Sequence, residues 1–99
     1  MLTHPQLINN LENLRTYITE TLCHHDQLEP NAFRMTERML VRGGEPCGMF
    51  FCLHGPRHVK FTAIWELERN TVLFYGPGGE RFHKTQLLRA VPLESEVLS

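Results

Sequence analysis

The chain has 99 residues, of which 41% are hydrophobic and 21% charged, and its formal net charge is −1 at pH 7. This composition is typical of one globular domain, and it excludes a disordered chain or a fibre. No apolar run is long enough to cross a bilayer, and the first residues lack the basic and apolar segments of a secretory signal. Because the three cysteines are also too few for a disulfide framework, we expect a cytoplasmic protein with reduced thiols.

The first segment has the pattern of an amphipathic helix. Apolar residues recur every three or four positions from Leu7 to Leu22, which is the helical period. Pro5 suits a first helical turn, because its missing N–H would have no partner there. The pattern predicts a helix from about residue 5 to about residue 24, followed by a loop over 27–31.

From Phe33 onward the pattern changes to the two-residue period of a β-strand. Apolar and basic residues alternate over 33–42, an apolar run fills 49–53, and a second alternating segment covers 58–66. A short β-rich segment follows at 71–75, and residues 81–88 fit either an edge strand or a helical turn. Turns rich in Gly and Pro separate these segments, so we expect consecutive strands to be antiparallel neighbours.

Together these elements predict an α+β fold in two layers. The N-terminal amphipathic helix packs on one face of a four- to five-stranded antiparallel meander sheet. Residues 1–90 form a single α+β domain in this prediction, and residues 91–99 form a frayed C-terminal tail.

Positive charge is concentrated in the predicted sheet. Residues 1–29 hold one basic and four acidic side chains, whereas residues 30–89 hold nine basic and five acidic ones. On the first and third strands the basic residues alternate with apolar ones, so they share the face away from the helix. Six residues of this face and its adjoining turn are the candidate binding residues for an anionic partner: Arg34, Arg38, Arg42, Arg57, His58 and Lys60. The alternative is a solvated face with Glu37, Glu66 and Glu68 as local ion-pair partners.

A cysteine–histidine cluster offers a different chemistry. Cys52 and His54 share one side of a strand, and His58 lies across the following turn, so these three residues form the candidate for a metal or redox site. Cys47 lies about 16 Å from Cys52 along the strand and on the opposite face, so these two thiols share neither a metal ion nor a disulfide. No G-x-S-x-G, H-E-x-x-H or paired-carboxylate motif is present, so we expect no enzymatic activity and no cofactor.

The aromatic content favours a protein partner. One helix cannot cover every large ring of a small sheet, so part of this apolar surface is expected to be covered by another chain. The rings concerned are Phe61, Trp65, Phe74, Tyr75 and Phe82. The first hypothesis is therefore a non-enzymatic interaction module that forms a homodimer or docks a protein partner through its sheet.

The alternative hypothesis is a nucleic-acid-binding protein that uses the basic face. A sheet that binds single strands combines positive charge with interleaved aromatic rings. On the outward side of the first and third strands, the imidazole of His58 is the only ring.

Overall fold

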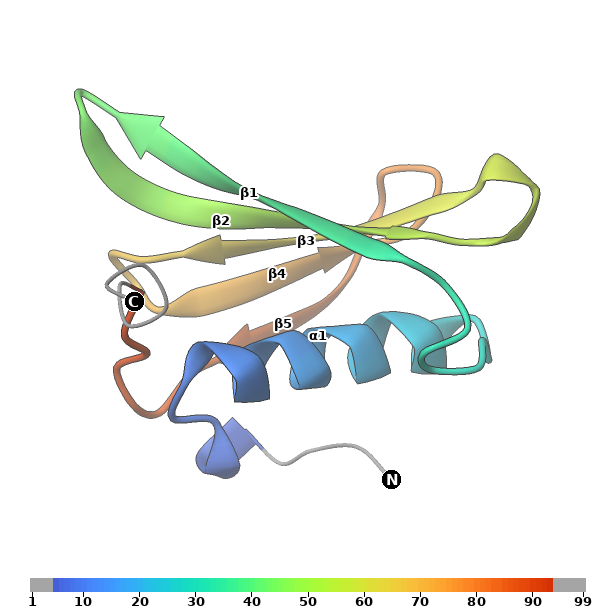
Figure 1. The fold of residues 1–99 in the computed structure, drawn as a ribbon, viewed down its shortest axis with the longest axis horizontal. Coiled ribbons are helices and arrows are strands. Elements are labelled where there is room, and N and C mark those ends of the chain that lie inside the picture. The colour runs from blue at the N-terminus through green and yellow to red at the C-terminus, as the bar shows by residue number, and fades with distance from the viewer. Residues whose placement is uncertain (1–4, 94–99) are drawn as a thin grey trace.

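The computed structural model describes residues 5–93, which form a helix and a five-stranded sheet (Figure 1). The elements are a 3-10 turn at Pro5–Leu7, α1 at Leu11–His25, β1 at Met35–Arg42, β2 at Glu45–His54, a 3-10 turn at Pro56–His58, β3 at Lys60–Glu66, β4 at Thr71–Tyr75 and β5 at Arg81–Gln86. The strands are antiparallel and lie in the order β1-β2-β3-β4-β5, which confirms the predicted α+β meander. None of the helices within 5–93 has the length and apolar character needed to pass through a lipid bilayer.

Helix α1 begins later than the sequence predicts. Pro5–Leu7 form a separate 3-10 turn, and α1 starts at Leu11. Asn10 caps it, because the Asn10 side chain accepts a 2.7 Å hydrogen bond from the backbone N–H of Asn13. The backbone of Asn10 is extended, with φ −150° and ψ 172°, so the helix cannot continue back toward Pro5.

The apolar side of α1 packs against one face of the sheet. Leu14, Ile18 and Leu22 are fully buried in this interface. Alternate residues of the central strands face them: Met49, Phe51, Leu53, Phe61, Ala63, Trp65, Val72 and Phe74. A buried hydrogen bond of 2.7 Å between the hydroxyls of Tyr17 and Thr85 also joins α1 to β5. In Figure 1, α1 accordingly runs along one side of the sheet and leaves the other side without a helix.

The core covers more aromatic surface than the sequence indicates. Phe61, Trp65 and Phe74 are at most 1% exposed. The segment after β5 adds to this cover, because Val91 is buried and Leu93 packs against the core. These two residues begin the predicted tail, whose residues 94–99 lie outside the described part of the chain. The expected surplus of aromatic surface is thus reduced to half-buried Tyr75 and Phe82.

An ion pair fixes edge strand β1 to the helix. Arg15 donates to Glu37 through Nε at 2.7 Å and through Nη2 at 2.9 Å, a two-pronged arrangement. Since Glu37 lies on the helix side of the sheet, it is not a partner for the basic residues of the opposite face.

Thr21 of α1 tests this description of the core. Its hydroxyl is buried and has no hydrogen-bond partner within residues 5–93, a situation that costs about 1–3 kcal/mol. Thr21→Val keeps the side-chain shape and removes the hydroxyl, so we expect the free energy of unfolding in urea to rise by about 1 kcal/mol. Thr16→Val, at an exposed position of α1, is the matched control and should change this free energy by less than about 0.5 kcal/mol. A Thr21→Val protein less stable than the wild type would contradict the description.

Candidate functional site

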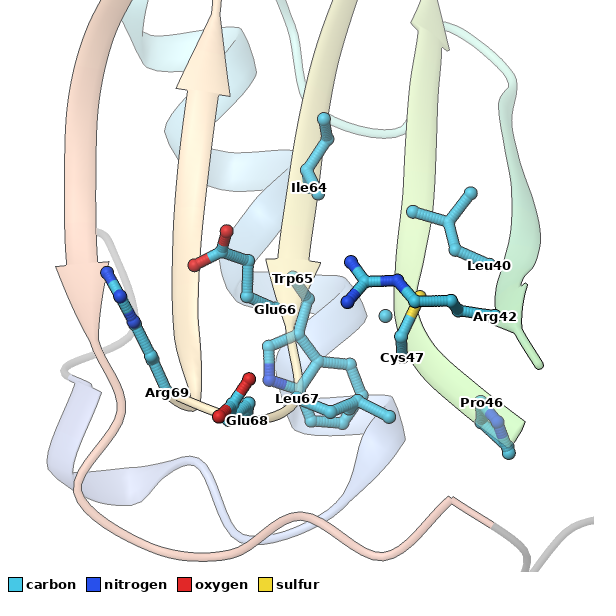
Figure 2. A pocket seen from close by; sticks show the side chains of 11 residues that line it. Leu40, Arg42, Pro46, Cys47, Ile64, Trp65, Glu66, Leu67, Glu68 and Arg69 are labelled. Atoms are coloured by element: carbon cyan, nitrogen blue, oxygen red, sulfur yellow. The ribbon is translucent and has the colours of Figure 1, made fainter. Parts of the chain in front are cut away.

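The face of the sheet opposite α1 is not covered by another helix or strand of residues 5–93. We call it the open face. Because strand side chains alternate, the open face carries every second residue of each strand. These are Thr36, Arg38, Leu40, Phe50, Cys52, His54, Lys60, Thr62, Ile64, Glu66, Thr71, Leu73, Tyr75, Arg81, Lys84 and Gln86. Figure 2 shows part of this face, with Ile64 and Glu66 on β3 and α1 behind the strands.

The strand register arranges these residues in rows. In the central row Arg38 pairs with Phe50, and the row continues through Ile64 and Leu73 to Lys84. An apolar centre therefore has a cation at each edge of the sheet. The next row toward the β2–β3 turn contains Thr36, Cys52, Thr62, Tyr75 and Arg81.

Two aromatic rings also lie on the open face. One is on β2, between the two strands that carry predicted cations, and the other is on β4, next to β3. Phe50 of β2 and Tyr75 of β4 are both half-buried. The guanidinium carbon of Arg38 lies 5.5 Å from the centroid of the Phe50 ring, within the range of a cation–π interaction. From ordinary strand spacings, Phe50 and Tyr75 are roughly 12 Å apart along a diagonal of the face. The face thus combines aromatic surface with positive charge.

The sequence prediction assigns neither ring to the basic face, because it compares only the first and third strands; Tyr75 enters it only among the surplus aromatic rings. Each ring is adjacent in sequence to a ring that the structure buries, Phe51 or Phe74, so strand alternation puts it on the opposite face. For Phe50 the sequence alone gives no such signal, because the run 49–53 is apolar at every position.

One end of the open face forms a basic hollow of about 340 Å³ beside the β2–β3 turn. Five basic side chains line it, together with Gly55 and Val59: Arg34, His54, Arg57, His58 and Lys60. We call these five residues the basic corner. The corner brings together four of the six predicted binding residues and adds His54. Within residues 5–93 no ion pair engages Arg34, Arg57 or Lys60, so their charges face solvent.

The backbone of the β2–β3 turn positions the corner. Arg57 and His58 have φ values of 55° and 64°, in the left-handed region that non-glycine residues seldom adopt. The turn is closed by a 2.7 Å hydrogen bond from the Gly55 N–H to the Val59 carbonyl. His54 is fixed twice, because its N–H donates to the Arg34 carbonyl at 2.8 Å and its Nε2 lies 3.0 Å from the Thr36 hydroxyl. Tertiary structure therefore holds an unfavourable backbone in place.

The remaining two predicted residues lie elsewhere. Arg38 stands over Phe50 in the central row, whereas Arg42 lies at the far end of the face. There Arg42 lines a hollow of about 660 Å³ with Cys47, Arg69 and two carboxylates, those of Glu66 and Glu68 (Figure 2). This hollow has balanced charge, unlike the basic corner. The six predicted residues accordingly do not converge on one site.

The cysteine–histidine candidate is not assembled. No three His, Cys, Asp or Glu side chains of residues 5–93 are grouped so that they could hold a metal ion. Cys52 is buried, with Thr36 and Thr62 as its cross-strand neighbours, and His58 is exposed on the turn. His54 instead forms its hydrogen bond with Thr36.

Comparison with protein-family models, curated proteins and solved structures finds no match to this chain. The chemistry of the site therefore follows from its own residues. The open face presents two rings, a half-buried apolar centre, cations at both edges and a basic hollow at one end.

The three thiols give a direct test of these placements. Burial, and then the nearby charge of Glu29, raise the pKa of the Cys23 thiol, so less of the reactive thiolate is present at neutral pH. Cys52 is also buried, whereas Cys47 is half-buried in the larger hollow. We expect iodoacetamide to label Cys47 first in the native protein, and Cys23 and Cys52 only after unfolding, as measured by peptide mass spectrometry. Labelling of native Cys23 as fast as Cys47 would contradict the structure.

Proposed function

We propose that this protein is a non-enzymatic module that binds single-stranded nucleic acid through the open face of its sheet. The observation that carries the proposal is the position of Phe50 and Tyr75, two half-buried rings on one uncovered face among cationic side chains. Bases stack on aromatic rings whatever their sequence, because every base has a π face. They also stack on guanidinium planes, which suits Arg38 above Phe50.

Four cations on the open face are placed to contact phosphates. Arg38 and Lys84 lie at the two edges of the central row, Arg81 lies beside Tyr75, and Lys60 belongs to the basic corner. All four side chains are exposed. A strand lying across the face would thus have its bases over the apolar centre and positive charge on both sides of its path.

Self-association is supported less well than nucleic-acid binding. The large exposed apolar residues are Leu7, Met39, Val41 and Leu88. Leu7 precedes α1, Leu88 follows β5, and the other two lie on β1, so the four do not form a patch on the open face. The aromatic surplus that favours a homodimer is mostly buried in the core. We therefore propose nucleic-acid binding rather than a homodimer.

Replacing the rings tests the proposal. Phe50→Leu and Tyr75→Leu keep apolar side chains but remove the aromatic surface, so each should weaken binding of a fluorescent oligothymidylate by about tenfold in an anisotropy titration. Phe82→Leu is the matched control, because Phe82 stacks on His25 of α1 and lies on the helix side. The control should bind like the wild type. Equal binding by all three variants, or no binding by the wild type, would contradict the proposal.

Salt provides a second test. Four phosphate contacts, at about 0.7 counterions released for each, predict a roughly 50-fold loss of affinity for single strands between about 50 and 200 mM salt. Lys84→Gln should reduce the slope of log affinity against log salt concentration by about 0.7. Arg89→Gln, an exposed position after β5, should leave the slope unchanged. An affinity independent of salt would argue against phosphate contacts.

A further inference from the structure

The basic corner lies beyond the stacking surface of the open face. His54 and Lys60 form its cross-strand pair, two residues further along the strands than Cys52 and Thr62. The sheet ends at this pair, because β2 and β3 are joined here by the Gly55–Val59 turn. A ligand that runs along the strands of the open face and stops where the sheet stops would therefore have its end at the corner.

The chemistry of the corner suits a compact anion. Its side chains supply two guanidinium groups, one ammonium and two imidazoles, and among residues 5–93 no carboxylate lines the hollow. Guanidinium groups bind phosphate oxygens through paired hydrogen bonds, and an ammonium acts as a point charge. A phosphate monoester has three free oxygens and up to two negative charges. An internal phosphodiester has only two free oxygens and one charge, so it would use less of the corner.

The β2–β3 turn also preorganises the basic corner for binding. Arg57 and His58 are held in left-handed backbone conformations, and His54 is fixed by Thr36 and by the Arg34 carbonyl. Part of the ordering needed to surround an anion is thus already present without a ligand, which lowers the entropic cost of binding. Such local strain is found at ligand sites more often than elsewhere.

We infer that the basic corner is a binding site for a phosphate monoester, taken from the phosphorylated end of a nucleic acid strand that lies on the open face. The assignment of that source rests on the proposed function, whereas the anion chemistry of the corner does not. The site would make the module selective for strand ends that carry a phosphate.

The first experiment tests the corner with inorganic phosphate alone. In a titration followed by NMR, the backbone amides of Arg57, His58 and Val59 should shift, whereas those of Arg42 and Arg69 in the balanced hollow should not. Arg57→Gln should abolish the shifts at His58 and Val59, and Arg89→Gln, which removes the same charge elsewhere, should preserve them. Absence of shifts at the corner, or equal shifts at both hollows, would overturn the inference.

The second experiment uses oligothymidylates of one length with a 5′-phosphate, a 3′-phosphate or hydroxyls at both ends. A phosphate at one of the two ends should tighten binding to the wild-type protein by about tenfold. This gain should vanish in Arg57→Gln and Lys60→Gln and persist in Arg89→Gln and in Tyr75→Leu. The same gain in all variants would overturn the inference.

The outcomes separate this inference from the proposed function. If the hydroxyl-ended strand binds and a phosphate at neither end improves binding, the inference fails while the proposed function stands. If inorganic phosphate binds at the corner but no oligonucleotide binds, the phosphate site is supported and the proposed function fails.

Discussion

The structure depends on one constraint, the alternation of strand side chains above and below a sheet that has a helix on one side only. Residues that face α1 form a close-packed core around Trp65, Phe51 and Phe74. Every residue of opposite parity then lies on the open face, whatever its chemistry. Phe50 and Tyr75 are half-buried there, flanked by their cross-strand neighbours, and no layer of residues 5–93 covers them. The open face is thus a direct consequence of the one α-helix and five strands that residues 5–93 form.

Charge is divided between the two layers in a way that suits an anionic ligand. Exposed carboxylates lie at Glu12 on α1 and at Asp26, which caps the C-terminal end of α1, on the far side of the core from the open face. Glu37 is bound by Arg15 on the helix side. A chain with a net charge of only −1 therefore has a locally positive face, and such local fields, rather than net charge, attract ligands. The basic corner is the strongest case, since none of the carboxylates in the described part of the chain lines it.

The parts of the fold with strong periodicity were predictable from the sequence. From Leu11 to Leu22 the helical stripe corresponds to α1, and the alternation over 58–66 corresponds to β3. The start of α1 was not predictable from the sequence, because Pro5 and Asn10 each suit the start of a helix. Only the extended backbone at Asn10 decides between them. The apolar run 49–53 also does not show which of its residues face the helix. Residues on both sides of β2 are apolar, so the pattern does not indicate which rings face outward.

The candidate site was predictable where it depends on neighbours in sequence, and not where it depends on register. Arg57, His58 and Lys60 follow one another through a single turn, so their grouping survives any change in pairing. Arg42 lies beyond an irregularity after Leu40, where Cys47 of β2 has no partner on β1, and it ends in a different hollow. Phe82 is likewise unpaired opposite β4 and stacks on His25, with 3.7 Å between the ring centroids. Such single-residue bulges cannot be predicted from the hydropathy pattern of the sequence.

The measurement that tests the central claim most directly is an NMR titration of isotope-labelled protein with an oligothymidylate, following both methyl groups and aromatic rings. If the open face is the binding surface, the methyls of Ile64 and Leu73 and the rings of Phe50 and Tyr75 should shift together and saturate at one concentration. The methyl signals of Leu14 and Ile18, which are buried on the other side of the sheet, should not shift. Shifts confined to α1 or to the chain ends, or no shifts at all, would contradict the account.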